Sequence, residues 1–410
     1  MATRALQKSF VLPSFVCVLL YASSVYSTIL SYNNKYSNKQ YPYFVSAEAE
    51  NNELLHLLSR SQSSLDLHSI VKDRERRSPE ANSDKPEPSP FVKNVTLNGT
   101  TNSGYAYVHW IGQDVSQKIF VLTFRLDSSS GKSLVLDSQV WRSSDYGSTF
   151  TLQNDKFQAK TNISLFYTFA TNSSKLLFTD VQARVLYTTA DELEHVHHHS
   201  VPVDPDIVLT HPSDDKKLLL YSLSHRQLYV SFDFAASWTM LAENVSPKFY
   251  WGHPDYDTDV DVVHMEELGS TPSQAIYKSC IAPKCTRTQE DVQGVGPFLS
   301  GTLQVHKEYM FIQKSNFMES EDYLLVSYKR GPFKRAYFPS DLKTDDFMLL
   351  DVDDGQVFVA VNHGNQVNLY LSEATGQFYV LSLENVYHTL LPNDFDIDFH
   401  EVSFFCLLII

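Results

Sequence analysis

The feature that most constrains the fold is a short pattern that occurs twice in the chain. Residues 140–150 read VWRSSDYGSTF and residues 229–238 read YVSFDFAASW. In each copy an apolar lead-in, which predicts a strand, is followed by turn chemistry in which an Asp side chain can hold the bend. We therefore predict a β-hairpin with a braced turn. Its structural residues are Ser143, Asp145, Gly147, Thr149 and Phe150 in the first copy, and Ser231, Asp233, Ser237 and Trp238 in the second.

Weaker copies of the pattern extend it into a repeat. The anchoring hydroxyls are 46, 42, 48, 48 and 45 residues apart, at Ser143, Thr189, Ser231, Ser279, Ser327 and Ser372. A lone hairpin is marginal in water, whereas a four-stranded propeller blade occupies about 40–50 residues. The spacing therefore predicts an all-β fold, a β-propeller of about six four-stranded blades.

The N-terminus is typical of a secretory signal. Arg4 and Lys8 precede the apolar run 10–27, which is too short to span a membrane, and small residues follow near Ser27. We assign residues 1–27 to a signal peptide and expect the chain to enter the secretory pathway.

A polar segment follows the signal and contains a basic site. Arg74, Arg76 and Arg77 form the R-x-R-R pattern that furin-like convertases cut, within a Pro-rich, exposed stretch. We predict a propeptide at 28–77, cut by a proprotein convertase, and a linker at 78–90. A solvated charge run is the alternative.

Secretion changes how the Asn and Cys residues are interpreted. Sequons at Asn94, Asn98, Asn162, Asn172 and Asn244 become candidate glycan sites on exposed loops. Cys280 and Cys285 can form a small disulfide loop, the alternative being two free thiols in a turn.

The rest of the chain, from residue 91 to about 402, alternates like strands and is rich in Val, Phe, Tyr and Thr. The net charge of −15 argues against a nucleic-acid partner, because phosphates are neutralised by cations.

These residues resemble a known family. The Asp box at 143–150, the stretch SHRQLYVSFDFAASWTMLAENV (224–245) and above all QVFVAVNHGNQVNLYLSEATGQFYVLSLENV (356–386) resemble the luminal domain of the sortilin family of sorting receptors, in particular its sortilin-related branch. The resemblance covers residues 91–402. It implies a ten-bladed propeller that binds peptide or protein ligands, and its own propeptide, inside a central tunnel. It further implies a membrane receptor that moves between Golgi, endosome and cell surface. No ligand contact can be matched residue by residue.

The sequence departs from that plan at its C-terminal end. It holds about six units, and the apolar tail SFFCLLII (403–410) does not continue the family pattern and is shorter than the roughly 20 residues that span a bilayer. We expect a partial propeller at 91–402 without a membrane anchor, which is then luminal or secreted. A natural short form that acts as a secreted decoy is the alternative.

Three further features of the sequence bear on chemistry. Asp boxes also occur in sialidase-like glycosidases, which carry a Phe-Arg-Ile-Pro motif; the nearest string here, FRLD (124–127), lacks the Pro. We interpret Asp145 and Asp233 as turn braces rather than as catalytic acids. We expect no enzyme activity, no cofactor and no metal. The cluster HVHHH (195–199) could bind a metal, although a solvated loop between units is favoured. The acidic runs 255–261 and 341–346 are interpreted as solvated loops, with Ca²⁺ ligation by the first conceivable.

Overall fold

The structure is a computed structural model that describes residues 17–20, 43–45, 92–95, 97, 105–111, 116–127, 134–271, 273–285, 295–316, 321–340, 342–353, 355–391 and 394–396. The expected convertase site at Arg74, Arg76 and Arg77, the linker 78–90 and the tail 403–410 lie outside these residues, as does nearly all of the expected signal and propeptide.

Six antiparallel sheets follow one another along the described chain, and we number them as blades 1 to 6. Blade 1 contains β2 (Tyr43–Val45), β4 (Tyr105–Trp110), β5 (Ile119–Asp127), β6 (Leu134–Ser143) and β7 (Thr151–Leu152). Blade 2 contains β8 (Leu165–Phe169), β9 (Asn172–Asp180), β10 (Val185–Thr189) and β11 (His197–Ser200). Blade 3 contains β12 (Ile207–Thr210), β13 (Leu218–Ser222), β14 (Gln227–Ser231) and β15 (Thr239–Glu243).

The second half of the chain repeats this plan. Blade 4 contains β16 (Val245–Trp251), β17 (Val262–Leu268), β18 (Gln274–Ile281) and β19 (Phe298–Leu299). Blade 5 contains β20 (Gln304–His306), β21 (Tyr309–Asn316), β22 (Glu321–Tyr328) and β23 (Lys334–Arg335). Blade 6 contains β24 (Asp346–Asp353), β25 (Gln356–Asn362), β26 (Val367–Ser372) and β27 (Tyr379–Leu383).

Three small elements lie outside the six blades or between their strands. β1 (Cys17–Leu20) pairs in parallel with β3 (Val92–Val95), and β28 (Thr389–Leu391) pairs with β29 (Asp394–Asp396). A 3₁₀ turn at Asn154–Lys156 follows β7.

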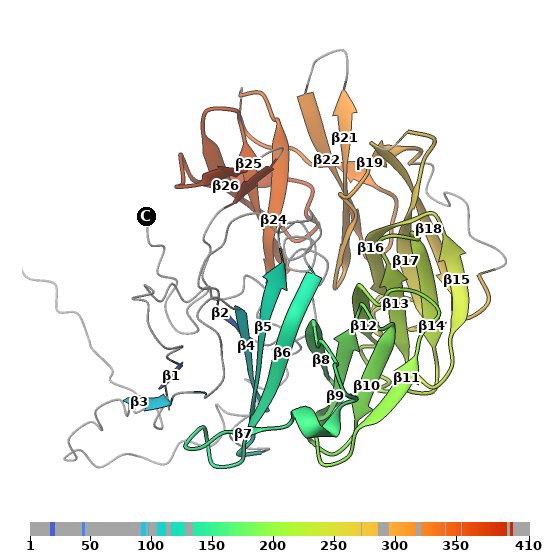
Figure 1. Ribbon diagram of the computed structural model, residues 1–410. Coiled ribbons are helices and arrows are strands. Elements are labelled where there is room, and N and C mark those ends of the chain that lie inside the picture. The colour runs from blue at the N-terminus through green and yellow to red at the C-terminus, as the bar shows by residue number, and fades with distance from the viewer. Residues whose placement is uncertain are drawn as a thin grey trace, which may run out of the picture.

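The blades are arranged around an arc in chain order (Figure 1). Apart from β2, which pairs with β4, the strands of each blade pair with their sequence neighbours, so that every blade contains an antiparallel meander. The prediction of an all-β propeller with about six four-stranded blades is confirmed. Five of the six sheets have four strands, and blade 1 gains a fifth from β2.

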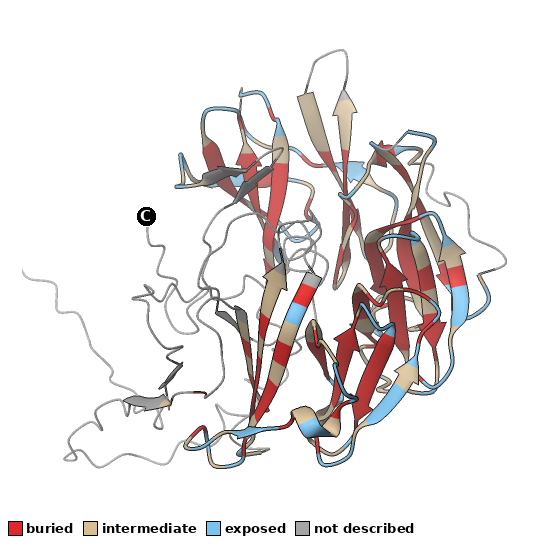
Figure 2. Cartoon of the chain, viewed as in Figure 1, coloured by how far each residue is buried: buried red, intermediate tan, exposed pale blue. Residues whose placement is uncertain are grey.

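The first and last strands of a blade have different surroundings. First strands such as β8, β12 and β16 are mostly buried, whereas the last strands β7, β11 and β23 are mostly exposed (Figure 2). The first strand therefore lies on the inner side of the array and the last strand on its outer rim, as in a propeller.

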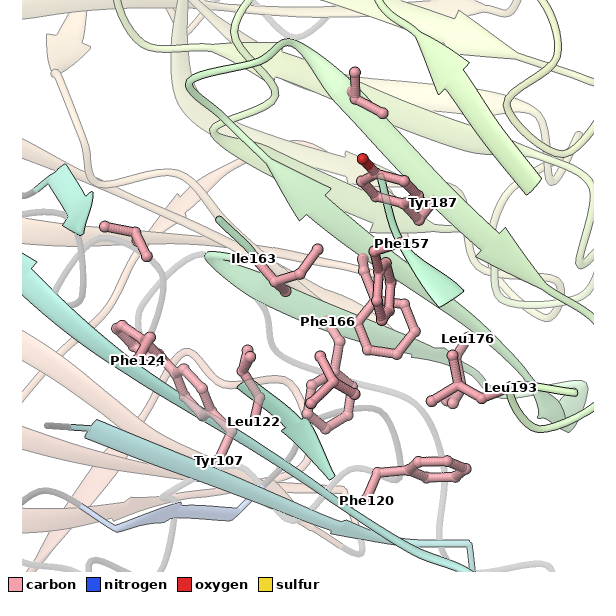
Figure 3. Close-up of a cluster of buried hydrophobic side chains, with 14 of the residues drawn as sticks. Tyr107, Phe120, Leu122, Phe124, Phe157, Ile163, Phe166, Leu176, Tyr187 and Leu193 are labelled. Atoms are coloured by element: carbon pink, nitrogen blue, oxygen red, sulfur yellow. The ribbon is translucent and has the colours of Figure 1, made fainter. Parts of the chain in front are cut away.

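The hydrophobic core lies between successive blades. The cluster between blades 1 and 2 brings Phe120, Leu122 and Phe124 of β5 against Phe166 and Leu176 of blade 2 (Figure 3). Equivalent clusters join every later pair of neighbours up to blades 5 and 6. Each blade thus buries its faces only when its neighbours are present.

This sandwiching explains why some strands are apolar throughout rather than alternating. In β13, Leu218 and Leu220 pack toward blade 2, whereas Leu219 and Tyr221 pack toward blade 4. Because successive side chains point to opposite faces, a strand covered on both sides needs apolar residues at every position.

Candidate functional site

The six anchoring hydroxyls all lie at the end of the third strand of a blade. Four of them are the last residue of β6, β10, β14 or β26, and Ser279 and Ser327 lie within two residues of the ends of β18 and β22. The sequence period therefore marks the hairpin between the third and fourth strands of every blade. The turns differ in how they are held together.

In blade 1 the turn is held by Asp145. Its Oδ1 accepts hydrogen bonds from Ser143 Oγ (2.8 Å) and from the Thr149 N–H (2.8 Å), and its Oδ2 accepts one from Thr149 Oγ1 (2.7 Å). The Gly147 N–H donates to Ser143 Oγ at 2.8 Å, and Gly147 has a φ of 79°. Phe150 packs against the Trp141 cluster of the same blade.

Blade 3 repeats this geometry. Asp233 accepts from Ser231 Oγ (2.9 Å), from the Ser237 N–H (2.8 Å) and from Ser237 Oγ (2.6 Å). Ala235 takes the place of Gly147, with a φ of 72° and a fully buried side chain. Trp238 packs against the cluster between blades 2 and 3.

Blade 2 contains a third braced turn; its anchor Thr189 was predicted from the sequence, but its brace by Asp191 was not. Thr189 Oγ1 donates to Asp191 Oδ1 at 2.9 Å, the His195 N–H donates to the same oxygen at 2.9 Å, and His195 Nδ1 lies 2.7 Å from Asp191 Oδ2. The interpretation of 195–199 as a solvated loop is wrong: His195 closes the turn, and 197–199 belong to the outer strand β11. The Thr-x-Asp spacing was the signal available in the sequence.

Three hairpins have other braces. In blade 4 the structure places Cys280 and Cys285 in a disulfide that closes the turn. In blade 5 Ser327 Oγ donates to the Gly331 carbonyl at 2.5 Å. In blade 6 Glu373 replaces the aspartate, and its carboxylate accepts the N–H groups of Thr375 (2.7 Å) and Gln377 (3.0 Å).

The braces stabilise ionised carboxylates. Partial burial raises the pKa of Asp145, Asp191 and Asp233. The hydrogen bonds that these carboxylates accept from their own turns lower the pKa, and together they outweigh the effect of burial. The net result is a lowered pKa for each, to about 2 for Asp191. These carboxylates are occupied by donors of their own hairpins.

The acidic run 255–261 forms the junctions of blade 4 with blades 3 and 5, and the interpretation as a solvated loop is wrong for its main members. The side chain of Asp257 is 6% exposed and forms an ion pair with Arg330 of blade 5. Its Oδ1 also lies 3.2 Å from Nε2 of His264. Asp261 accepts Lys217 of blade 3 at 2.7 Å. Among the residues described, no three His, Cys, Asp or Glu side chains are grouped to hold a metal ion.

The most suggestive feature for ligand binding is the fifth strand of blade 1. β2, which falls within the expected propeptide, pairs antiparallel with β4, and Phe44 lies opposite Tyr107. Because β4 is the first strand of its blade, β2 lies on the inner edge of the array. In the described chain the first strands of the other five blades have no such added strand.

Polar side chains recur on the inner strands. They are buried and comprise His109 of β4, Thr168 of β8, Thr210 of β12, Lys248 of β16 and His306 of β20. Burial lowers the pKa of His109 to about 4 and that of His306 to about 3, so both rings are neutral at physiological pH. Sequence reasoning did not find these residues, because the alternation of a strand does not tell which side faces the centre.

A narrow pocket lies between blades 5 and 6. It has room for about one water molecule and is lined by Thr302, Gln304, Phe311, Gln313, Leu324, Phe347, Leu349 and Val359. The space is too small for a peptide side chain.

The candidate glycan sites lie in different settings. Asn244 is exposed in the β15–β16 connection, whereas Asn162 and Asn172 are half-buried in the connections before β8 and at the start of β9. The Asn94 backbone lies in β3, and Asn98 is outside the described residues. No helix in the described part of the chain is long and apolar enough to cross a membrane.

Together the blades and their braced turns define a β-propeller. A family model described as Sortilin-Vps10 (Sortilin, neurotensin receptor 3) matches residues 138–404. The chain belongs to this Sortilin-Vps10 family.

Individual relatives agree with this assignment. The chain is 32% identical over 319 residues to the VPS10 domain-containing receptor SorCS3 of Homo sapiens, covering 75% of the chain and 25% of the relative. It is 31% identical over 321 residues to the Sortilin-related receptor of Oryctolagus cuniculus, covering 74% of the chain and 14% of the relative. The chain thus spans a quarter or less of these relatives.

Among solved structures, the GH74 xyloglucanase from Xanthomonas campestris is similar with a TM-score of 0.40 and 12% identity, over 66% of this chain and 46% of that one.

Proposed function

We propose that the chain is the ligand-binding part of a non-catalytic sorting and endocytic receptor, which takes up peptide or protein ligands at the centre of its propeller. The observation that carries the proposal is the pairing of β2 with the inner edge of β4. An exposed strand edge offers a row of unpaired N–H and C=O groups, to which an extended peptide can add as another strand.

The propeptide is the first ligand expected at this edge. Residues 43–45 fall within the segment 28–77 that cleavage after Arg77 would release. Before cleavage the segment is tethered to the domain, which gives it a high effective concentration; after cleavage it can leave, and the edge becomes available. A proprotein convertase would then control when ligands can bind.

The role of the braced turns separates this proposal from a glycosidase. Glycoside hydrolysis needs an acid and a nucleophile that are free to act on the sugar. Asp145 and Asp233 are engaged by their own turns, and Arg125 of FRLD pairs across the sheet with Asp137. A sorting role also implies transport through Golgi and endosomes, or release as a decoy if the receptor lacks its anchor.

Binding of the propeptide segment tests the proposal. The whole chain is secreted from cultured cells, treated with a convertase, and titrated with a labelled peptide of residues 38–50, with binding followed by fluorescence anisotropy. We expect saturable binding that increases after cleavage. A matched peptide with N-methyl groups on Tyr43, Phe44 and Val45 cannot donate the strand hydrogen bonds, and we expect it to bind at least tenfold more weakly.

Two results would contradict the proposal. Equal binding of the N-methylated peptide would exclude strand addition, and turnover of a fluorogenic sialoside by the same preparation would favour the glycosidase.

A further inference from the structure

The outer strand of blade 2 is composed almost entirely of histidine. β11 reads HHHS, its residues 197 and 198 are exposed, and His195 immediately precedes it with 82% of its side chain exposed (Figure 2). Blades 1 and 3 have Thr151 and Thr239 at the position that corresponds to His197. The blade architecture therefore does not require imidazoles here.

The ring of His195 is oriented by the braced turn. Its Nδ1 lies 2.7 Å from Asp191 Oδ2, where Thr149 and Ser237 place their hydroxyl groups in the neighbouring blades. An ionised carboxylate can only accept, so Nδ1 carries the proton and donates it. In the neutral ring Nε2 then has a free lone pair. A carboxylate that accepts from the second ring nitrogen is the usual support of a metal-binding histidine.

A second exposed imidazole, that of His197, lies two residues further along the chain. Val196 and Tyr187 both pack toward the cluster between blades 1 and 2. His198 is paired with Tyr187 and therefore lies on the face of the sheet that carries this cluster. His197 is paired with Thr188 and therefore lies on the opposite face. Val196 separates His195, at the bend before β11, from His197, and both of these imidazoles are exposed.

The spacing of these two residues suits one ion. The Cα atoms of residues two apart in the chain are at most about 7 Å from each other, and two imidazoles can converge from that distance on an ion bound at about 2.0–2.1 Å. His199 lies on the same face but is half-buried, with Nε2 3.0 Å from Thr188 Oγ1. No third ligand is grouped with the pair in the described part of the chain, so water would complete the shell.

We propose that His195, through Nε2, and His197 form a two-histidine site for a divalent transition-metal ion on the outer rim of blade 2. Imidazole ligands suit Cu²⁺, Ni²⁺ and Zn²⁺, with Cu²⁺ bound most tightly, whereas Ca²⁺ and Mg²⁺ require oxygen ligands. The site lies on the rim and is independent of ligand binding at the inner edge.

The experiment uses the whole secreted chain, purified without a histidine tag and titrated with Cu²⁺ alone. Calorimetry gives the stoichiometry, and electron paramagnetic resonance of the bound Cu²⁺ reports its nitrogen ligands. We expect one Cu²⁺ per chain with two nitrogen ligands, and no saturable binding of Ca²⁺.

Sister blades supply matched variants. His195→Thr and His197→Thr introduce the residues that blade 1 carries at these positions, Thr149 and Thr151, so the brace is retained and the melting temperature should stay close to that of the wild type. Each variant should lose at least about tenfold in Cu²⁺ affinity. His198→Thr removes an imidazole from the other face and should bind like the wild type.

Three outcomes would overturn the proposal. These are no saturable Cu²⁺ binding by the wild type, unchanged affinity in His195→Thr or His197→Thr, and an equal loss in His198→Thr, which would indicate unspecific binding by a histidine-rich strand.

Discussion

Asp257 and Arg330 lie 73 residues apart in the sequence and form a two-pronged ion pair between blades 4 and 5. Arg330 Nε donates to Oδ1 at 2.8 Å, and a terminal nitrogen of the same guanidinium donates to Oδ2 at 2.7 Å. The side chains are only 6% and 13% exposed. Arg330 also donates to the Lys307 carbonyl at 2.9 Å, so one side chain links the turn of blade 5 to two other segments.

Removing the arginine should strongly destabilise the chain. Arg330→Ala leaves the buried Asp257 carboxylate without its main partner, a change that costs about 3–5 kcal/mol in other proteins. We expect the free energy of unfolding, measured by chemical denaturation, to fall by that amount. Lys343→Ala is the matched control, because its pair with Asp345 is largely exposed and should contribute about 0–1 kcal/mol. A loss below about 1 kcal/mol in Arg330→Ala would contradict the role assigned to the pair.

The stability of the folded chain should decrease as the pH is lowered, because His109 on the inner strand β4 is buried as a neutral ring. Burial lowers its pKa to about 4, and its Nε2 has no hydrogen-bond partner in the described part of the chain. The unfolded chain takes up a proton below about pH 6.5, whereas the folded chain resists it until about pH 4. In that window the unfolded state binds more protons. The stability that the neutral ring contributes is therefore fully present above pH 6.5, and it declines by about 1.4 kcal/mol for each pH unit as the pH falls from 6.5 toward 4.

The substitution that tests this slope is His109→Phe, which keeps an aromatic ring next to Phe166. The difference in unfolding free energy between variant and wild type should shift in favour of the variant by about 1 kcal/mol between pH 6.5 and 5.5. His198→Phe, which replaces an exposed imidazole, serves as the control. A pH-independent difference for His109→Phe would show that the ring is not buried in its neutral form.

The repeat could be predicted from the sequence because a braced turn is a local structure. All partners of Asp145 lie within four residues of it, so their spacing is visible in the chain. The brace of blade 2 was not recognised, although its anchor Thr189 was predicted, because Leu193 and His195 replace the small residue and the hydroxyl. The hydrogen bond to Thr189 Oγ1 (3.0 Å) is donated by the backbone N–H of Leu193, so it does not depend on which side chain residue 193 carries, and Leu193 is fully buried between the blades.

The junctions and the inner edge could not be predicted in the same way. The partner of Asp257 lies in another blade, and no local pattern marks it. The order of strands in the sheet decides whether β4 has a free edge and whether β2 covers that edge. The sequence therefore predicts the unit and its turns, and only the assembled array shows which polar groups meet.

Loss of a brace should lower stability. Asp145→Ala removes the acceptor of three hydrogen bonds from a turn that is largely solvated, and we expect a loss of about 1–3 kcal/mol. The readouts are the melting temperature and the yield of secreted protein, both of which should fall. Asp155→Ala, in the 3₁₀ turn that follows β7, is the control outside the brace. Unchanged yield and melting temperature in Asp145→Ala would remove the structural role of the carboxylate.

A glycan on Asn244 would have to be attached before blade 4 is complete. Asn244 is exposed, but the hydroxyl of its sequon belongs to Ser246, which is 2% exposed and donates to Glu266 Oε2 at 2.6 Å. Glu266 is fully buried and also accepts the N–H groups of Gly301 (2.8 Å) and Leu303 (2.6 Å) at the junction with blade 5. The folded chain therefore hides the residue that the glycosylation sequon requires.

Two substitutions separate the glycan from the hydrogen bond. Asn244→Gln should lose one glycan, seen as a mass shift that disappears on enzymatic deglycosylation, with little change in unfolding free energy. Ser246→Ala should lose the same glycan and in addition about 1–3 kcal/mol, because one donor to a buried carboxylate is removed. Ser246→Thr keeps both the sequon and a hydroxyl, and so should retain the glycan. If the folded, unglycosylated chain accepted a glycan at Asn244 in vitro, the buried hydroxyl would not limit modification, and the proposed order of events would be wrong.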